Sequence, residues 1–307
     1  MYLVILLVSV GIPSYNEGVG ILRIMEALRN QKKDENFAIL EVIVLDDSSD
    51  NTPFHVNKFI ANQHGYPQLR MIHHDERRGQ PAAWNELMRE AKGDILVLLD
   101  GDVVIHSDLL SSLVRCFKSD RQIGLVAGNA QPFNPRSFAG FGSYLAGLLL
   151  CRLQERASNS KFTVIGRCVA LKREVIDKVV ILSRAISSDL YLTCRSLELG
   201  YKVVRDENSM VYFHPSESFR DFASQTIRAI IGHRQLKKYS KKLIHGSIRL
   251  ADQLIETLII LRENKNQAPA LIAACGLLPI YAPSVLKGSS SHIWEIASSS
   301  KMPMKSV

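Results

Sequence analysis

Short apolar runs alternate along this chain with longer stretches in which apolar residues recur at helical spacing. The apolar runs occupy residues 3–12, 40–45, 69–72, 95–99 and 123–127. After the first run, the i, i+3, i+4 spacing of a helix with one buried face is kept by Ile21, Leu22, Met25 and Leu28. Alternating strands and helices are typical of βαβ units. The pattern therefore predicts an α/β fold of three layers around a mostly parallel central sheet.

The run 95–99 leads directly into candidate chemistry. It reads Ile-Leu-Val-Leu-Leu, which fits a short strand buried on both faces, and Asp100-Gly101-Asp102 follows it. Parallel strands bind ligands beyond their carboxyl ends, and residues i and i+2 of an extended chain point the same way. Asp100 and Asp102 are thus able to converge on one Mg²⁺ or Mn²⁺ ion, with water and phosphate oxygens as further ligands. The alternative is an ordinary turn, since Asp and Gly favour turns.

Polar clusters also follow the first two predicted strands. They are Pro13-Ser14-Tyr15-Asn16-Glu17 and Asp46-Asp47-Ser48-Ser49-Asp50. Helix capping and turn formation explain the last three residues of the second cluster. A carboxylate such as Asp46 or Asp47 at a strand tip is able to accept from a nucleobase N–H, and Tyr15 to stack on a base. Neither cluster has the glycine pattern of a dinucleotide-binding site or a P-loop.

A basic segment, Arg77-Arg78-Gly79, precedes a predicted helix that contains Ala82, Ala83 and Leu87. Two arginines and exposed amides at the start of a helix are able to hold a diphosphate. Solvated surface charge is the alternative.

Length and composition limit the class of protein. The chain has 307 residues, 46% of them hydrophobic, enough for one large domain or one domain with an appendage. Its five cysteines include no C-x-x-C pair, which argues against a disulfide framework and a zinc site and predicts a reducing, cytoplasmic setting. The apolar N-terminus shows no basic leader or small-residue cleavage site, so we interpret it as the first buried strand.

Most of the net charge of +8 lies in one segment. Residues 220–249 contain eight Lys or Arg and one acid, a local charge of +7. A chain that is nearly neutral elsewhere is not basic throughout, so we expect one basic face and no nucleic-acid partner. Helical spacing is kept here by Phe219, Phe222, Ala223, Ile227, Ile230 and Ile231. The segment is predicted to be a basic amphipathic helix on an anionic membrane, with packing on the rest of the protein as the alternative.

A second apolar segment follows at residues 268–286. Its nineteen residues are uncharged and just long enough to span a bilayer. Pro269, Gly276, Pro279 and Pro283 interrupt it, so a re-entrant, interfacial or buried hairpin is an equal alternative. The chain is thus expected to divide into an α/β domain at 1–215 and a basic amphipathic and hydrophobic helical region at 216–307.

The order and spacing of four motifs resemble family 2 glycosyltransferases of the GT-A fold. The motifs are Pro13-x-Tyr15-Asn16-Glu17, Leu45-Asp46-Asp47-Ser-Ser-Asp, Arg77-Arg78-Gly79-Gln-Pro-Ala-Ala-x-Asn and Leu99-Asp100-Gly101-Asp102. The resemblance implies that the first two hold a nucleoside, the third lies by a diphosphate, and the fourth meets nucleotide and metal. The implied donor-binding residues are Pro13, Tyr15, Asn16, Glu17, Asp46, Asp47, Arg78, Gly79, Asp100 and Asp102. The implied cofactor is a divalent cation, Mg or Mn, on Asp102 and Asp100.

The second half resembles the same family less closely. Gly166 matches a glycine of an acceptor-side strand, and Asp189 matches the catalytic aspartate, with Ser188 in place of the usual acid. From the residues alone, Ser187 or Ser188 caps a helix that has Asp189 in its first turn. Gln225 and Arg228 match a Q-x-x-R-W segment on the acceptor or diphosphate side. Ala229 replaces its Trp, which argues against processive polysaccharide synthesis.

The resemblance covers roughly residues 8–240 and implies a metal-assisted, inverting transfer. The donor would be a UDP- or GDP-type nucleotide-diphosphate sugar, bound by about residues 1–105. The acceptor would be a lipid-linked, saccharide or protein hydroxyl on the side formed by about residues 106–215, with Asp189 as general base. The expected location is the cytoplasmic face of a membrane. Two rivals stay open: a nucleotidyltransferase, and an inactive nucleotide-sugar-binding scaffold that Ser188 would suit.

Overall fold

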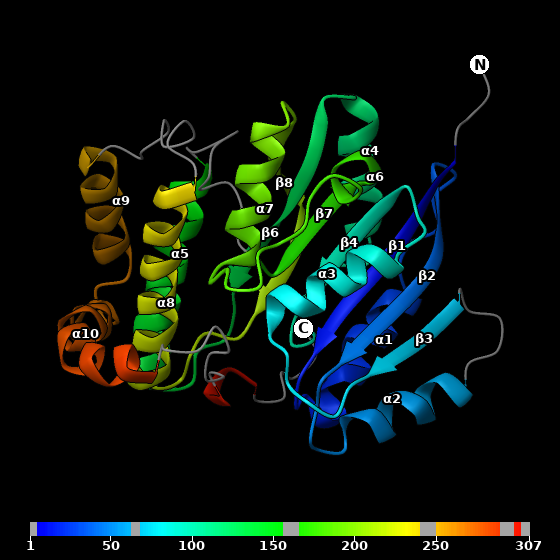
Figure 1. Cartoon of the computed structure of the whole chain (residues 1–307). Helices are drawn as coiled ribbons and strands as arrows, with labels where there is room; N and C mark the ends of the chain where they lie inside the picture. The colour runs from blue at the N-terminus through cyan, green and yellow to red at the C-terminus, as the bar shows by residue number, and fades with distance from the viewer. Residues whose placement is uncertain (1–4, 63–67, 156–165, 240–249, 289–297, 302–307) are drawn as a thin grey trace.

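The computed structural model describes residues 5–62, 68–155, 166–239, 250–288 and 298–301. Within them, eight strands form one sheet in the order β3-β2-β1-β4-β7-β6-β8-β5 (Figure 1). The strands are β1 Leu6–Ser14, β2 Phe37–Asp46, β3 Gln68–His73, β4 Ile95–Leu99, β5 Val104–Ile105, β6 Ile123–Pro132, β7 Cys168–Lys172 and β8 Lys202–Phe213. The helices are α1 Ile21–Arg29, α2 Thr52–Ala61, α3 Gln80–Glu90, α4 Leu109–Ser119, α5 Phe138–Glu155, α6 Arg173–Ile176, α7 Ser188–Glu198, α8 Phe219–Tyr239, α9 Leu250–Glu263 and α10 Ala268–Gly288, with 3-10 turns η1 Gly18–Gly20 and η3 Ser298–Lys301.

Most neighbouring strands are parallel, as predicted. β1 is parallel to β2 and β4, β2 to β3, and β6 to β8. β7 is antiparallel to β4 and β6, and β5 to β8. The five predicted runs correspond to β1, β2, β3, β4 and β6, and β4 has the predicted bounds. Residues 3 and 4 of the first run lie outside the described residues.

The hydrophobic pattern did not predict β8. Its middle reads Arg205-Asp206-Glu207-Asn208, so its apolar run is broken. At the same place the register between β6 and β8 shifts, between Gly128 and Asn129. A strand with a polar, irregular middle has no periodic signal of its own, and pairing with β6 decides its conformation.

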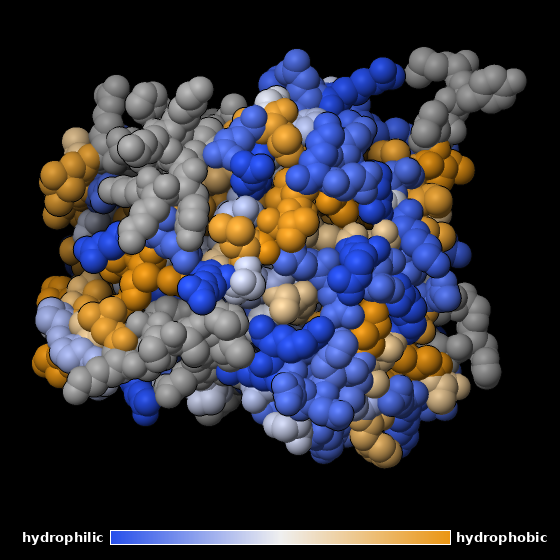
Figure 2. Space-filling view, viewed as in Figure 1, coloured by the Kyte–Doolittle hydropathy of each residue, from blue (hydrophilic) through white to orange (hydrophobic). Residues whose placement is uncertain are grey.

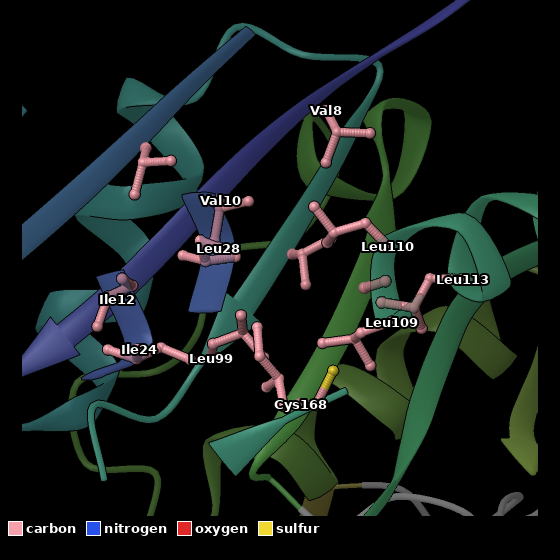
Figure 3. Close-up of a cluster of buried hydrophobic side chains, with 14 of the residues drawn as sticks. Val8, Val10, Ile12, Ile24, Leu28, Leu99, Leu109, Leu110, Leu113 and Cys168 are labelled. Carbon is pink, nitrogen blue, oxygen red and sulfur yellow. The ribbon is translucent and has the colours of Figure 1, made fainter. Parts of the chain in front are cut away.

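Strand β4 is buried on both faces, which explains its continuous apolar sequence. Ile95, Val97 and Leu99 point into a cluster with α1 and α4, part of which is shown in Figure 3. Leu96 and Leu98 point to the opposite face, into a cluster with α3 and α6. The predicted three layers are therefore present, with helices on both faces of the sheet (Figure 1).

A separate group of helices, α5, α8, α9 and α10, lies beside the sheet (Figure 1). A third apolar cluster around Leu145, Ile260 and Leu271 joins α5 to α9 and α10. Residues from the middle of the chain and from its C-terminal part thus share one small core.

The predicted apolar stripe lies on α8, and half of it is buried inside the protein. Phe222, Ala223 and Ile227 are buried, because α8 packs against α5, α7 and α10. Ile230, by contrast, is 44% exposed. For the described residues the alternative of packing on the protein is correct. The basic residues at 241, 242 and 249, and the side chains at 237 and 238, lie outside what the structure describes.

The apolar segment 268–286 forms one helix, α10, with Pro279 and Pro283 inside it. In the described part of the chain, it is the one helix long and apolar enough to cross a membrane by length and composition. A core helix of a soluble protein can pass that test, yet only 17% of this stretch is buried. Apolar side chains that face outward continue onto α9, where Leu254 is 57% and Leu258 65% exposed (Figure 2).

The start of β4 supplies a test of the packing. A Cβ at Gly93 would lie 2.6 Å from the backbone nitrogen of Ser9 and 2.7 Å from the carbonyl oxygen of Leu7. We expect Gly93→Ala to lower the free energy of unfolding by about 1–3 kcal/mol or more, because two backbone segments must separate. Gly20→Ala is the matched control, since its Cβ would meet nothing within 4 Å. Urea denaturation measures both, and equal stability of the two variants would contradict the close approach.

Candidate active site

The carboxylates that follow β4 are held together by one arginine. Arg167 Nη1 lies 3.3 Å from Asp100 Oδ2, and 3.2 Å from Oδ1 and 3.5 Å from Oδ2 of Asp102. Asp100 and Asp102 therefore converge as predicted, and Arg167 is a site residue that the sequence did not single out. The three side chains are largely withdrawn from water, with exposures of 25%, 18% and 17%.

Arg167 is placed by the reversed direction of β7. It directly precedes this antiparallel strand, so it lies at the edge where β4 ends, and its carbonyl accepts from the Asp100 N–H at 3.2 Å. Its guanidinium also lies over the ring of Phe213, 4.6 Å from the centroid. Burial raises the pKa of Asp100 to about 6; Arg167 opposes this shift and Asp102 adds to it.

The first polar cluster, after β1, is tied to the second. Asn16 adopts φ 53, a left-handed conformation that Asn tolerates. Its N–H donates to Ser48 Oγ at 2.7 Å, and its Oδ1 accepts from the Ser49 N–H at 2.9 Å. Tyr15, next to it, lies under the guanidinium of Arg77, 4.4 Å from ring centroid to Cζ. The two clusters thus form one continuous surface at the ends of β1 and β2, which begins at Pro13 in β1.

Glu17 faces a residue from the far end of the chain. Lys301 Nζ lies 2.5 Å from Glu17 Oε1 and also donates to the carbonyl of Tyr15. The pKa of Glu17 is raised to about 7, mainly by burial and then by the Asp102 carboxylate, while Lys301 acts in the opposite direction. Glu17 is therefore part of the same charged group as the pair after β4.

The remaining donor-side candidates have partners within the protein. Asp46 accepts from the Ser48 hydroxyl at 2.5 Å and contacts His73 Nδ1 at 2.9 Å. Asp47 accepts from the backbone N–H of Arg78 at 2.9 Å and from its guanidinium. Gly79 has φ 85, which favours glycine, and stands at the N-cap of α3. These residues lie at the expected edge of the sheet and shape the loops around it.

Asp189 lies in the first turn of α7, with Ser187 at the N-cap position but without a side-chain capping hydrogen bond. Backbone N–H groups of Leu190, Asp189 and Gly166 donate to its carboxylate; burial nevertheless raises its pKa. A Cβ at Gly166 would lie 3.1 Å from Asp189 Oδ2, so the glycine permits this approach. Ser188 is fully buried, and its hydroxyl has no hydrogen-bond partner among the described residues.

Helix α8 brings Arg228 to the same place. The charges of Asp189 and Asp100 both act on Arg228, although this residue is exposed to solvent. The helix is fixed by Gln235, which donates to the Arg184 carbonyl at 2.7 Å and accepts from the Ile186 N–H at 3.0 Å. Gln225 lies one turn before Arg228 on α8. The acceptor-side candidates thus meet the metal-binding candidates at one edge.

Side chains at this edge fit a divalent cation, although the described residues hold no ready group of three His, Cys, Asp or Glu ligands. Mg²⁺ and Mn²⁺ are commonly held by one or two carboxylates, with phosphate oxygens and water completing the shell. His214, after β8, is buried, and neither ring nitrogen has a hydrogen-bond partner among the described residues. Burial and the charge of Arg136 lower the pKa of His214, whereas Glu217, 3.6 Å from its Nδ1, and Asp102 raise it.

A partly parallel sheet with acidic and basic side chains gathered at its carboxyl edge is the arrangement of GT-A glycosyltransferases. The model of Glycosyl transferase family 2 matches residues 9–180, more than half of the chain. The model of Glycosyl transferase family group 2 matches residues 95–287. The chain belongs to glycosyltransferase family 2 and is an enzyme of that class.

Individual relatives agree with this assignment. Glycosyltransferase AglE of Haloferax volcanii is 27% identical over 234 residues, 75% of this chain and 73% of that protein. Poly-beta-1,6-N-acetyl-D-glucosamine synthase of Staphylococcus aureus is 26% identical over 68% of this chain, which spans half of the synthase's length. A mannosyltransferase, PcManGT from Pyrobaculum calidifontis, solved in complex with GDP-Man and Mn²⁺, shares the fold with a TM-score of 0.60 and 20% identity. That likeness covers 92% of this chain and 79% of the mannosyltransferase.

Glu17 determines a pH dependence of stability. Its pKa rises from 4.5 to about 7 on folding, so between these values the folded protein binds a proton that the unfolded chain releases. The contribution of Glu17 to the free energy of unfolding therefore falls as pH rises through this range. We expect Glu17→Gln to raise the Tm more at pH 8 than at pH 5. Glu26→Gln, on the exposed surface of α1, should give the same small difference at both pH values; equal behaviour of the two variants would contradict the raised pKa.

Proposed function

We propose that this enzyme transfers a sugar from a UDP- or GDP-type nucleotide sugar to an acceptor hydroxyl, with inversion at the anomeric carbon. The observation that carries the proposal is the close approach of Asp189 to Gly166, whose chain neighbour Arg167 bridges Asp100 and Asp102. A general base and a diphosphate-binding edge are the two parts that a single displacement requires. The division into a catalytic domain at 1–215 and a helical region at 216–307 belongs to the same proposal.

The donor would lie along the ends of β1, β2 and β4. Tyr15, Asn16 and Glu17 would face the nucleoside, with the loops that Asp46, Asp47 and Gly79 shape, and Arg78 would lie by the diphosphate. Asp102 and Asp100 would hold Mg²⁺ or Mn²⁺, with His214 as a further candidate ligand. The ion, when bound, would neutralise the charge that grows on the departing nucleoside diphosphate. The GDP-Man and Mn²⁺ named for the mannosyltransferase support this class of donor and cofactor.

Asp189 has the surroundings of a general base. Burial raises its pKa, although three backbone N–H groups donate to its carboxylate. It would accept the proton of an acceptor hydroxyl, while Arg228 and Gln225 would contact the acceptor or the diphosphate. Because one carboxylate acting as base implies one displacement, the product configuration inverts.

The two rival functions differ from sugar transfer in what they release, and an inactive scaffold would release nothing. A nucleotidyltransferase would release pyrophosphate, whereas a sugar transfer releases nucleoside diphosphate. The family assignment favours the second. The case for an inactive scaffold was the serine at position 188, where the family has an acid. The Ser188 side chain is buried, so we infer that it does not alter the surroundings of Asp189.

The helices α9 and α10 are proposed to rest on the cytoplasmic face of a membrane. Both helices have large apolar side chains that are exposed, namely Leu250, Leu254, Ile255, Leu258, Ile272 and Ile280. Segment 220–249, with its charge of +7, leads directly into α9 and would complement anionic lipid. A peripheral or anchored enzyme would meet a lipid-linked acceptor there, although saccharide and protein acceptors fit the same chemistry.

The roles of Asp189 and Asp102 are separable. Without a positioned base, turnover should fall about 10²- to 10⁴-fold while donor binding is kept, because the base acts on the acceptor in the transition state. We expect this result for Asp189→Asn. Asp102→Asn should instead lose the Mn²⁺-dependent rise in Tm that a matching nucleotide sugar gives. A thermal-shift panel of UDP-, GDP- and dTDP-sugars with and without Mn²⁺, followed by release of nucleoside diphosphate, measures both. Near-normal turnover of Asp189→Asn would remove it from the mechanism.

The membrane proposal predicts a loss of vesicle binding in one double variant. Leu254→Gln with Leu258→Gln removes two exposed apolar contacts from α9, and should weaken co-sedimentation with anionic vesicles by about tenfold or more. The control pairs Val180→Gln with Leu182→Gln, which are 74% and 42% exposed but lie between α6 and α7. Unchanged binding of the α9 variant, or an equal loss in the control, would count against a bilayer at this surface.

A further inference from the structure

The carboxylate pair after β4 already has a cation of its own. One nitrogen of Arg167 lies within 3.5 Å of both carboxylates and bridges them. The Glu17 carboxylate also acts on this guanidinium, and the pKa of Arg167 is raised, because its acidic neighbours outweigh the effect of burial. A divalent ion that used both carboxylates would need the place that this nitrogen occupies.

We propose that Arg167 couples metal binding to donor binding. In the free enzyme its guanidinium bridges Asp100 and Asp102 and opposes the entry of Mg²⁺ or Mn²⁺. When a nucleoside diphosphate arrives, the guanidinium turns onto the diphosphate oxygens and leaves the carboxylates to the ion. Metal and diphosphate then bind together far better than either binds alone. This inference rests on the proposed function for its ligand, but not for its first step.

The balance of charge supports the exchange. Arg167 and Arg228 already repel each other at this edge. A divalent cation added beside both, without an anion, would increase the positive charge next to two guanidinium groups. A diphosphate supplies negative oxygens that suit the planar donor array of a guanidinium. Each ligand thus removes the electrostatic obstacle to the other, which is a reciprocal coupling of two binding free energies.

The anchoring of Arg167 permits such a movement. Its backbone is fixed where β7 pairs with β4, by the hydrogen bond from Asp100 to its carbonyl. Within the described residues, the guanidinium is held over the ring of Phe213 and by the carboxylates, and no backbone carbonyl accepts from it. Arg173, at the other end of β7, differs: its guanidinium donates to the carbonyls of Ala91 and Gly93. The first arginine is therefore able to change partners without disturbing the sheet, whereas the second is part of it.

The first test uses Mn²⁺ alone. Wild-type enzyme should bind Mn²⁺ weakly, as measured by electron paramagnetic resonance of the free ion. Arg167→Met should bind it about tenfold more tightly or better, because the competing cation is gone. Arg167→Lys keeps a positive charge and should stay closer to wild type. Arg89→Met removes the same charge from a side chain that is 68% exposed on α3, and should change Mn²⁺ affinity less than twofold.

The second test adds nucleoside diphosphate. In wild type, saturating UDP or GDP should raise Mn²⁺ affinity by about tenfold or more. In Arg167→Met this gain should shrink, and the affinity for the nucleoside diphosphate in EDTA should fall. If the methionine variant does not fold, Arg167→Gln and the wild-type comparison give the same readout.

Two results would overturn the coupling. One is an Mn²⁺ affinity of the folded Arg167→Met protein within twofold of wild type. The other is wild-type binding of UDP or GDP that is equally tight in EDTA and in Mn²⁺, which would make Arg167 a permanent substitute for the ion. A failure of every nucleotide to bind would contradict the proposed function instead, and the Mn²⁺ measurement would still decide the role of Arg167.

Discussion

The antiparallel pairing of β7 with β4 is the constraint on which the candidate site depends. β4 and its other neighbour, β1, are parallel, so both end at the same edge of the sheet. Because β7 runs the opposite way, it begins where they end, and Gly166 and Arg167 enter the site from its start. Without this reversal, neither Gly166 nor Arg167 would lie at this edge. One reversed strand thus adds a basic side chain and the close approach of Gly166 to Asp189.

The same edge concentrates charge at a cost to stability. Burial raises the pKa of Glu17 to about 7 and that of Asp100 to about 6, so their charged forms are disfavoured in the folded protein. The cations that compensate them, Lys301 and Arg167, come from distant parts of the chain. Ionisable groups with strongly perturbed pKa values gather where proteins bind or transform charged ligands. The position of these carboxyl groups with raised pKa values therefore agrees with the family assignment, which rests on sequence similarity.

The sequence predicted what local pattern can specify. β4 and its two aspartates were found because an apolar run meets acids at one point, and Asp189 and Arg228 were found by resemblance. Arg167 was missed since a lone arginine after a glycine has no pattern until β7 is paired in reverse. His214 was also missed, because it follows β8, a strand whose polar middle prevented its prediction from the hydrophobic pattern. The stripe on α8 was recognised, but an amphipathic pattern shows that one face is apolar and does not show what covers it. The contact that Lys301 makes has no signal in the sequence.

The pairing of Glu17 with Lys301 is able to form only late in the synthesis of the chain. The two residues are 284 positions apart, and chains grow at about 5–20 residues per second, so roughly 15–60 s of synthesis separate them. The central strands and their aspartates exist long before Lys301 is made. During that interval Glu17 lacks its compensating charge, and the Asp102 carboxylate beside it favours protonation. The compensating charge of Glu17 is therefore among the last parts of this edge to be synthesised.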